Sequence, residues 1–220
     1  MDAPYYVIDG IRYPRLTRVL SILREPEVEV WQATTVNAEE ESGKARQLGT
    51  VVHAAIAADI TGEPVKMSTR DGFHSCWVAY QRWKHHQEKT VQPMWVCEQP
   101  YVQREGRYAC TVDYAEWDSV TGVVREFKTS TRIQEKYWLQ LSAQAAAVWE
   151  DWRHRQITLQ VVRLDKVLGE YEQQMRTLIP ADVETFFHLV QVYRRWYGHE
   201  LEKQDGTPEV EVADGKAAAF

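Results

Sequence analysis

Two carboxylates and a lysine come close together in a stretch whose pattern predicts a β-hairpin. Glu126 and Lys128 are two residues apart on the second predicted strand, so their side chains point to the same face of a sheet. Asp113 lies on the preceding strand and reaches that face if the register allows it. Two carboxylates repel each other unless a divalent cation binds them, and oxygen ligands of this kind suit Mg²⁺ or Mn²⁺. The lysine could then hold an attacking water or a phosphate oxygen, so the set favours metal-assisted phosphodiester hydrolysis.

The elements that must position these side chains follow from the hydrophobic pattern. Apolar and polar residues alternate from Tyr108 to Trp117, and a second run from Val123 to Thr129 follows turn residues, which predicts an antiparallel hairpin. A helix is expected from about Gln134 to Trp152, and it carries Gln140 and Gln144 one turn apart. We expect the rest of the chain to be organised around this hairpin and helix.

A histidine upstream of the hairpin is a further candidate for metal chemistry. Gly49 and His53 are four residues apart and share a face of a helix expected from Gly49 to Ile60. Glycine there would let another backbone approach closely, as a packed active-site helix needs. His53 could present a ring nitrogen to a metal held by the hairpin; the alternative is a buried histidine with a purely structural role.

The remaining pattern predicts helices and strands that would surround this centre. An N-terminal hairpin is expected at 5–13, helices at 16–23, 28–47 with an interruption near Ser42 and Gly43, 71–89 and 181–201, and strands at 91–104, 156–164 and 169–178. We expect one domain over 1–201 with a helical N-terminal part, and a flexible polar tail at 202–220.

Composition and charge narrow the class of protein. The chain has 220 residues, 44% of them hydrophobic, which suits a single domain with a sizeable core. It has no run of about 18 apolar residues and no basic segment followed by an apolar one at its start, so neither a membrane span nor a secretory signal is expected. Three widely spaced cysteines, Cys76, Cys97 and Cys110, favour a reducing compartment. The net charge of −6 argues against nonspecific coating of DNA but allows one basic groove.

The order of these parts resembles a known enzyme family. The chain has, in this order, a helix with a Gly-Thr-x-x-His motif whose histidine is His53, a strand with Asp113, the run Glu126-Phe127-Lys128-Thr129-Ser130, and a helix with Gln140. This order is similar to that of the PD-(D/E)xK nuclease superfamily. Within it, the chain resembles the RecB-type exonuclease branch, which includes the mitochondrial genome maintenance exonuclease and its phage relatives. The resemblance covers roughly 17–149. A lone Asp/Glu-x-Lys motif is a weak signal, because residues 214–216 in the polar tail have the same form. The resemblance therefore depends on the order of the motifs and on the elements in which they lie.

The resemblance implies a fold and a role for each residue. The fold would be α/β with a restriction-endonuclease-like core, a mixed central sheet of about four or five strands flanked by helices. Asp113 and Glu126 would be metal ligands, with the Phe127 carbonyl as a third oxygen and His53 on the same or a second metal, so that two Mg²⁺ or Mn²⁺ ions are expected. Lys128 would orient or deprotonate the water. The implied position of Gln140 is near Lys128 or the scissile phosphate. The secondary candidate is Glu98, whose alternative is a salt-bridged surface residue.

The resemblance also implies a substrate. It would be DNA, single-stranded or with free ends, cleaved in repair, recombination or phage genome processing, and recombination or replication proteins are possible partners. The candidate DNA contacts are Arg104, Arg107, Thr129, Ser130, Arg132 and Lys136. The expected location is the cytoplasm of a bacterial or phage-infected cell, with no membrane partner. Some relatives hold an iron–sulfur cluster on four cysteines; this chain has three, so none is expected.

Two alternatives stay open at this point. The chain could be a noncatalytic nucleic-acid-binding or assembly protein on a nuclease fold. It could also be a double-strand-specific endonuclease of the restriction type. Metal-dependent release of nucleotides from labelled DNA separates the first from an enzyme, and a circular substrate without ends separates the second from an exonuclease.

Overall fold

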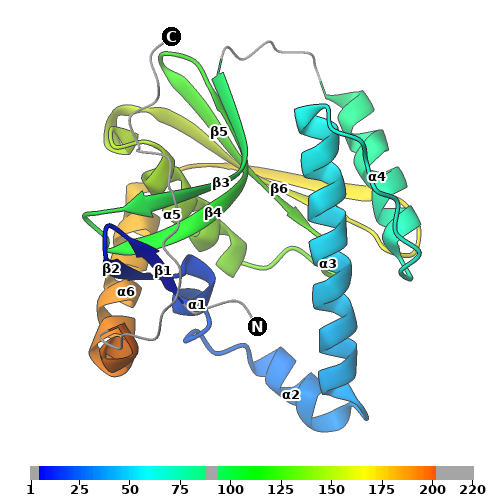
Figure 1. The fold of residues 1–220 in the computed structure, drawn as a ribbon, viewed down its shortest axis with the longest axis horizontal. Helices are drawn as coiled ribbons and strands as arrows, with labels where there is room; N and C mark the ends of the chain where they lie inside the picture. The colour runs from blue at the N-terminus through cyan, green and yellow to red at the C-terminus, as the bar shows by residue number, and fades with distance from the viewer. Residues whose placement is uncertain (1–4, 88–93, 202–220) are drawn as a thin grey trace.

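A computed structural model of the chain describes residues 5–87 and 94–201 (Figure 1). The described strands are β1 (Tyr5–Ile8), β2 (Ile11–Pro14), β3 (Met94–Gln103), β4 (Tyr108–Trp117), β5 (Thr121–Lys128), β6 (Gln156–Leu164) and β7 (Tyr171–Thr177). The described helices are α1 (Leu16–Leu20), α2 (Pro26–Thr34), α3 (Ala38–Thr61), α4 (Phe73–His86), α5 (Lys136–Val148) and α6 (Pro180–Leu201), with a short 3-10 turn at Trp152–His154. None of these helices is long and apolar enough to cross a membrane.

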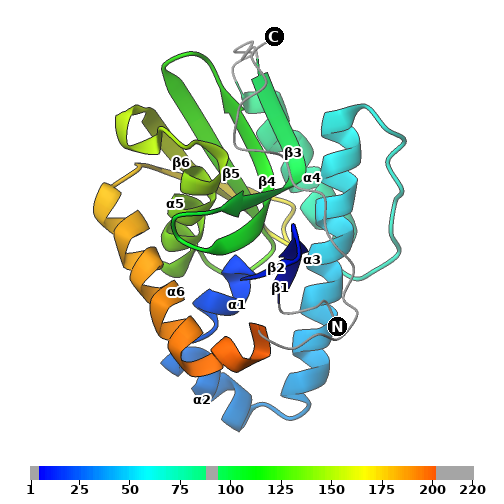
Figure 2. The ribbon, with the colours of Figure 1, turned by 60° about the vertical axis from the view of Figure 1, so that its left-hand side comes forward.

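The centre of the fold is a five-stranded mixed sheet in the order β3-β4-β5-β6-β7. All neighbouring pairs are antiparallel except β5 and β6, which are parallel and are joined by a crossover through α5. Helices α3 and α4 lie on one side of the sheet, and α5 and α6 lie on the other, with α1 packed against α5 and α6 (Figures 1 and 2). The expected α/β fold with helices flanking a mixed sheet is confirmed.

Helix α5 is enclosed on all sides, which fixes the polar groups that it carries. Its small residues Ala143 and Ala145 are fully buried between the sheet and α6. Beyond its end, the Trp149 ring lies so close to Gly122 on β5 that a Cβ at Gly122 would come within 2.7 Å of it. Because the helix cannot shift without disturbing this packing, its buried polar side chains are held at fixed positions against the sheet.

Helix α3 corrects two expectations drawn from glycine. It runs without a break from Ala38 to Thr61, so Gly43 does not interrupt it. A glycine costs a helix about 1 kcal/mol, and here the buried stripe that includes Leu48, Val52 and Ile56 offsets this by packing against the sheet and α4. Nor does Gly49 serve a close backbone approach: only the Thr129 hydroxyl would come within 4 Å of an added Cβ, at 3.9 Å.

The other expected elements lie close to where the sequence placed them. The strand expected at 156–164 matches β6, and the N-terminal hairpin turns at Asp9 and Gly10, both with positive φ. The expected strand at 91–104 begins before the described residues, which resume at Met94. The tail at 202–220 lies outside the described residues.

Candidate active site

The site begins at an interruption of the sheet. Cys97 pairs with Tyr114 and Gln99 pairs with Val112, but the two residues between them, Glu98 and Asp113, do not form a ladder pair. Glu98 has a φ of 49°, in the left-handed region that a residue with a Cβ rarely adopts. Such a conformation turns a side chain away from the regular alternation of a strand. Here the Glu98 carboxylate comes to the same place as the Asp113 carboxylate.

The neighbouring pair of strands separates at the same level. Pairing of β4 with β5 runs from Trp117 to Tyr114 and stops there. One residue further along, the Asp113 side chain takes over from the backbone: its Oδ2 accepts a hydrogen bond from the Phe127 amide at 3.0 Å. Asp113 therefore sits in the opening between two strands, held by its own carboxylate.

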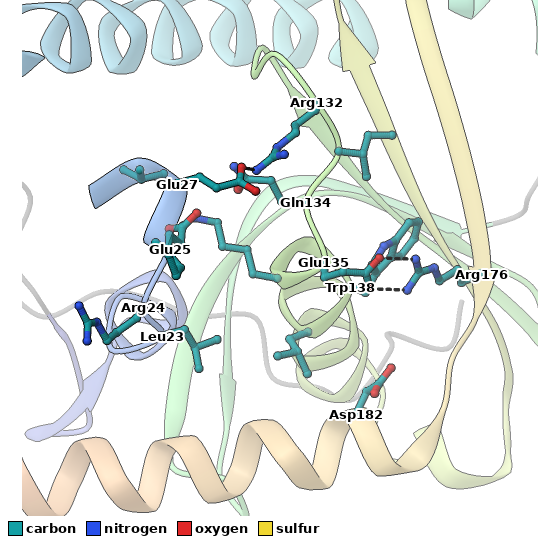
Figure 3. A pocket seen from close by; sticks show the side chains of 15 residues that line it. Leu23, Arg24, Glu25, Glu27, Arg132, Gln134, Glu135, Trp138, Arg176 and Asp182 are labelled. Carbon is teal, nitrogen blue, oxygen red and sulfur yellow. Dashed lines mark hydrogen bonds and ion pairs between the residues drawn. The ribbon is translucent and has the colours of Figure 1, made fainter. Parts of the chain in front are cut away.

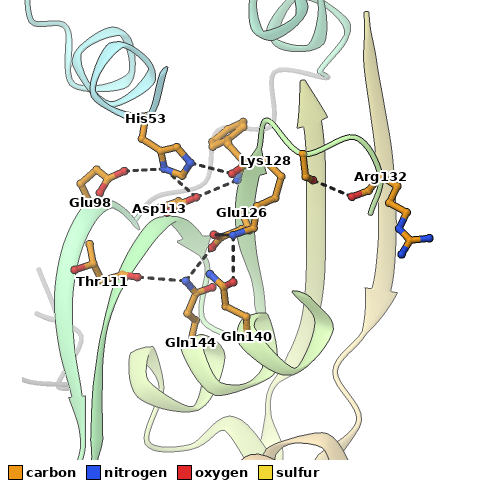
Figure 4. A network of polar contacts seen from close by, with 11 residues as sticks. His53, Glu98, Thr111, Asp113, Glu126, Lys128, Arg132, Gln140 and Gln144 are labelled. Carbon is orange, nitrogen blue, oxygen red and sulfur yellow. Dashed lines mark hydrogen bonds and ion pairs between the residues drawn. The ribbon is translucent and has the colours of Figure 1, made fainter. Parts of the chain in front are cut away.

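Helix α3 brings His53 over this opening (Figure 4). The ring Nδ1 lies 3.4 Å from Asp113 Oδ2 and 3.5 Å from Glu98 Oε1, and Nε2 lies 3.0 Å from the Phe127 carbonyl oxygen. One ligand atom from each of His53, Glu98 and Asp113 falls within 4.8 Å of the others. One imidazole and two carboxylates at such separations can converge on a single divalent cation, so the donor set fits Mg²⁺ or Mn²⁺.

The charges in this cluster show what a cation would replace. Burial favours the neutral ring of His53, but the carboxylates of Asp113 and Glu98 outweigh it and raise the pKa of His53 well above its ordinary value. The positive charge of the protonated His53 ring therefore balances the negative charge of the Asp113 and Glu98 carboxylates. A bound cation would take over that role, with release of the proton and the neutral ring as a ligand.

Helix α5 supplies the other half of the site, from the opposite side of the sheet (Figure 4). Lys128 Nζ donates to Glu126 Oε1 at 2.6 Å and to Gln140 Oε1 at 3.2 Å, and it lies 4.7 Å from the centre of the Tyr137 ring. Burial would lower the pKa of Lys128, but the carboxylates of Glu126 and Asp113 outweigh burial and hold it above its ordinary value. The ammonium therefore stays charged within the protein.

Gln144 is a member of the site that the sequence analysis missed. It is 1% exposed, and its Nε2 donates to Glu126 Oε2 at 3.0 Å and to the Thr111 carbonyl at 3.2 Å. With Lys128 on one oxygen and Gln144 on the other, the Glu126 carboxylate is held from both sides. The signal was present in the sequence, because Gln144 follows Gln140 by four residues and so shares its helix face.

The structure brings together some of the predicted residues and not others. One cluster contains His53, Glu98, Asp113, Glu126, Phe127, Lys128 and Gln140. Thr129, Ser130 and Arg132 lie on the connection from β5 into α5, and Lys136 is the first residue of α5. Arg104 and Arg107 lie in the β3–β4 turn, six residues along the strands from Glu98 and Asp113, which is up to roughly 20 Å away. Arg104 there faces Asp9, at 3.4 Å. The long strands carry this turn away from the site, and the expected contact of these two arginines with DNA stays a prediction.

Comparison with known proteins adds little to this geometry. No protein-family model and no curated protein matches the chain. Among solved structures, an alkaline exonuclease (LHK-Exo) from Laribacter hongkongensis is similar at 12% identity and a TM-score of 0.46, covering 86% of this chain and 90% of that one. LHK-Exo in complex with dAMP is similar at 14% identity and a TM-score of 0.47, covering 86% and 89%. At these TM-scores neither structure carries weight for the function of this chain.

Proposed function

We propose that this chain is a metal-dependent deoxyribonuclease that hydrolyses phosphodiester bonds. The observation that carries the proposal is the cluster of His53, Glu98 and Asp113 beside the ion pair of Lys128 with the buried Glu126. An imidazole and two carboxylates can hold Mg²⁺ or Mn²⁺, and a lysine at the edge of a cation site suits displacement at phosphorus.

Asp113 would be the central metal ligand. Its carboxylate lies against His53 on one side and against the backbone of β5 on the other. Glu98 completes the described cluster. Glu126 and the Phe127 carbonyl are the further ligands in our proposal, which takes two ions. When bound, such ions supply positive charge at the attacked phosphate and lower the pKa of a bound water.

The role of Lys128 is to hold an oxygen in place. Its side chain is partly buried, and contacts with Glu126 and Gln140 fix the direction of the ammonium. In our proposal the group orients or deprotonates the attacking water, or holds a phosphate oxygen as a point charge. Gln140 acts by fixing the ammonium from α5.

The proposed substrate is DNA with a free or single-stranded end. The net charge of −6 repels a long duplex, whereas a strand end can enter a narrow site with local positive charge. The Thr129 hydroxyl lies at the exit of β5, where it can donate to a phosphate oxygen, and the Ser130 hydroxyl could do so only by giving up its hydrogen bond to the Arg132 carbonyl. Repair, recombination or phage genome processing would use such an activity.

The test is nucleotide release from end-labelled single- and double-stranded DNA in Mg²⁺, Mn²⁺ or EDTA. We expect release from open ends with either cation and none in EDTA. Asp113→Asn, which keeps the size of the side chain and a hydrogen-bond acceptor, should be inactive. Full activity in EDTA, or no release under any condition, would refute the nuclease. Efficient cutting of covalently closed circular duplex would refute the preference for ends.

A further inference from the structure

An open groove lies beside the site, on the outer side of the first turn of α5 (Figure 3). Its volume is about 740 Å³. One wall is the segment from Leu23 to Val28, which leads into α2, and the facing wall is the segment from Arg132 to Lys136, with Arg176 of β7 beyond it. These walls are more than 100 residues apart in the sequence.

Ion pairs connect the two walls. Arg132 pairs with Glu27, and Lys136 Nζ lies 2.5 Å from Glu25 Oε1. Both cations belong to the chain that runs from β5 into α5, and both carboxylates belong to the segment that leads into α2. Arg132 and Lys136 are thus each neutralised by a carboxylate from the facing wall.

The cationic wall adjoins the active site through the first turn of α5. Lys136 immediately precedes Tyr137, whose ring lies 4.7 Å from Lys128 Nζ. Gln140, one turn further along α5, contacts the same ammonium. The first turn of α5 therefore contributes Lys136 to the groove, while Tyr137 and, one turn on, Gln140 contact the Lys128 ammonium of the site.

The acidic wall is held only weakly. Helix α2 buries none of its residues, and the side chain of its N-cap residue, Glu25, makes no capping hydrogen bond. The side chains of Arg132 and Glu27 are 59% and 70% exposed, and ion pairs with such exposure are weak because water screens them. A polyanion can therefore displace the carboxylates without unfolding the core.

We propose that this groove takes the phosphodiester backbone of the substrate strand, and that Glu25 and Glu27 are internal counter-ions which its phosphates displace. This inference rests on the proposed function and extends it. It assigns to Glu25 and Glu27 the role of opposing DNA binding, whereas Arg132 and Lys136 favour it. Arg132 and Lys136 bind phosphate once the carboxylates have moved away. The carboxylates lower the affinity for DNA and select for strands that offer several phosphates at once.

The experiment measures binding separately from hydrolysis. A fluorescent single-stranded oligodeoxynucleotide is titrated with the protein in EDTA, and anisotropy gives the Kd. We expect the Glu25→Gln, Glu27→Gln double variant to bind roughly three- to tenfold more tightly than wild type. Glu40→Gln, Glu41→Gln is the matched control, because it makes the same charge change at carboxylates that pair with Lys44 on α3, outside the groove.

A second pair of variants distinguishes local from general electrostatics. In an Arg132→Ala, Lys136→Ala background, the gain from the two glutamines should vanish, because no cation is left for them to release. A gain that persists there, or one equal to that of the control, overturns the proposal. Thermal unfolding checks that all variants are folded. If wild type and the variants bind DNA as expected but wild type releases no nucleotides in Mg²⁺ or Mn²⁺, the proposed nuclease activity is refuted. The assignment of the groove as a DNA-binding site then still stands.

Discussion

Replacing Gln144 by leucine tests whether Glu126 depends on α5 for its position. The substitution keeps roughly the volume of the side chain but removes its amide from a site where it is 1% exposed. Both partners of the Gln144 Nε2, Glu126 Oε2 and the Thr111 carbonyl, are acceptors, so the amide group can face them in only one orientation. Leucine leaves both of them without a donor.

The magnitude follows from these contacts. A hydrogen bond to a charged acceptor contributes about 1.5–3 kcal/mol, and one to a neutral carbonyl contributes about 1 kcal/mol. Gln144 Oε1 is itself buried without a partner, so removing it recovers part of that loss. The net decrease in the free energy of unfolding should be about 1–2 kcal/mol, which for a chain of this length lowers Tm by about 3–6 °C.

The assay pairs thermal unfolding with rates measured over a range of Mn²⁺ concentrations. A residue that orients a metal ligand typically changes metal affinity or activity by about 10–100-fold, so Gln144→Leu should need correspondingly more Mn²⁺. Gln140→Leu is the matched control one turn away, since it loses only a contact with Lys128 and should leave the Mn²⁺ requirement nearly unchanged. A Gln144→Leu protein with wild-type Tm and wild-type Mn²⁺ dependence would refute the reasoning.

Three further outcomes are expected. Lys128→Ala should abolish cleavage in the nucleotide-release assay while DNA binding in EDTA stays within about threefold, because the metal ligands remain; near-normal turnover would make Lys128 structural. His53→Ala should weaken Mn²⁺ binding, measured by calorimetry, by about tenfold or more, and unchanged binding would remove the ring from the metal site. Gly122→Ala should lower stability by about 1–3 kcal/mol in denaturant unfolding, because its Cβ would meet Trp149 at 2.7 Å. Gly43→Ala, with nothing within 4 Å, should be neutral or stabilising by up to about 1 kcal/mol, and equal effects of the two glycine changes would contradict the packing.

Residues that follow strand and helix periods were predictable from the sequence. The contact between Glu126 and Lys128 follows from their spacing of two on one strand, and the hydrogen bond from Lys128 to Gln140 follows once a helix succeeds that strand. The same reasoning failed where tertiary packing overrides local preference. Gly43 was expected to interrupt a helix, but the packing of the α3 stripe carries the helix through it.

The approach of Glu98 to the site could not be derived from periodicity. It depends on the register of β3 against β4, which sets Glu98 opposite Asp113, and the alternation within a single strand does not fix that register. The distance of Arg104 from the site likewise depends on the lengths of β3 and β4, which the hairpin pattern does not fix. Gln144 was accessible in principle, since a second amide four residues after Gln140 on a helix rich in alanine has few structural uses other than a shared polar face.

The hydrogen bond from the Phe127 amide to Asp113 affects how a catalytically dead variant should be made. Alanine at position 113 would remove a metal ligand and also leave a buried amide without an acceptor, at a cost of about 1–3 kcal/mol. Loss of activity in that variant would therefore have two possible causes, the missing metal ligand and a weakened contact between β4 and β5. Asparagine retains a carbonyl oxygen for the Phe127 amide, while it removes the charge and replaces the second oxygen with an NH₂ donor. It is therefore the substitution that separates the metal-binding role of the carboxylate from its contact with the backbone of β5.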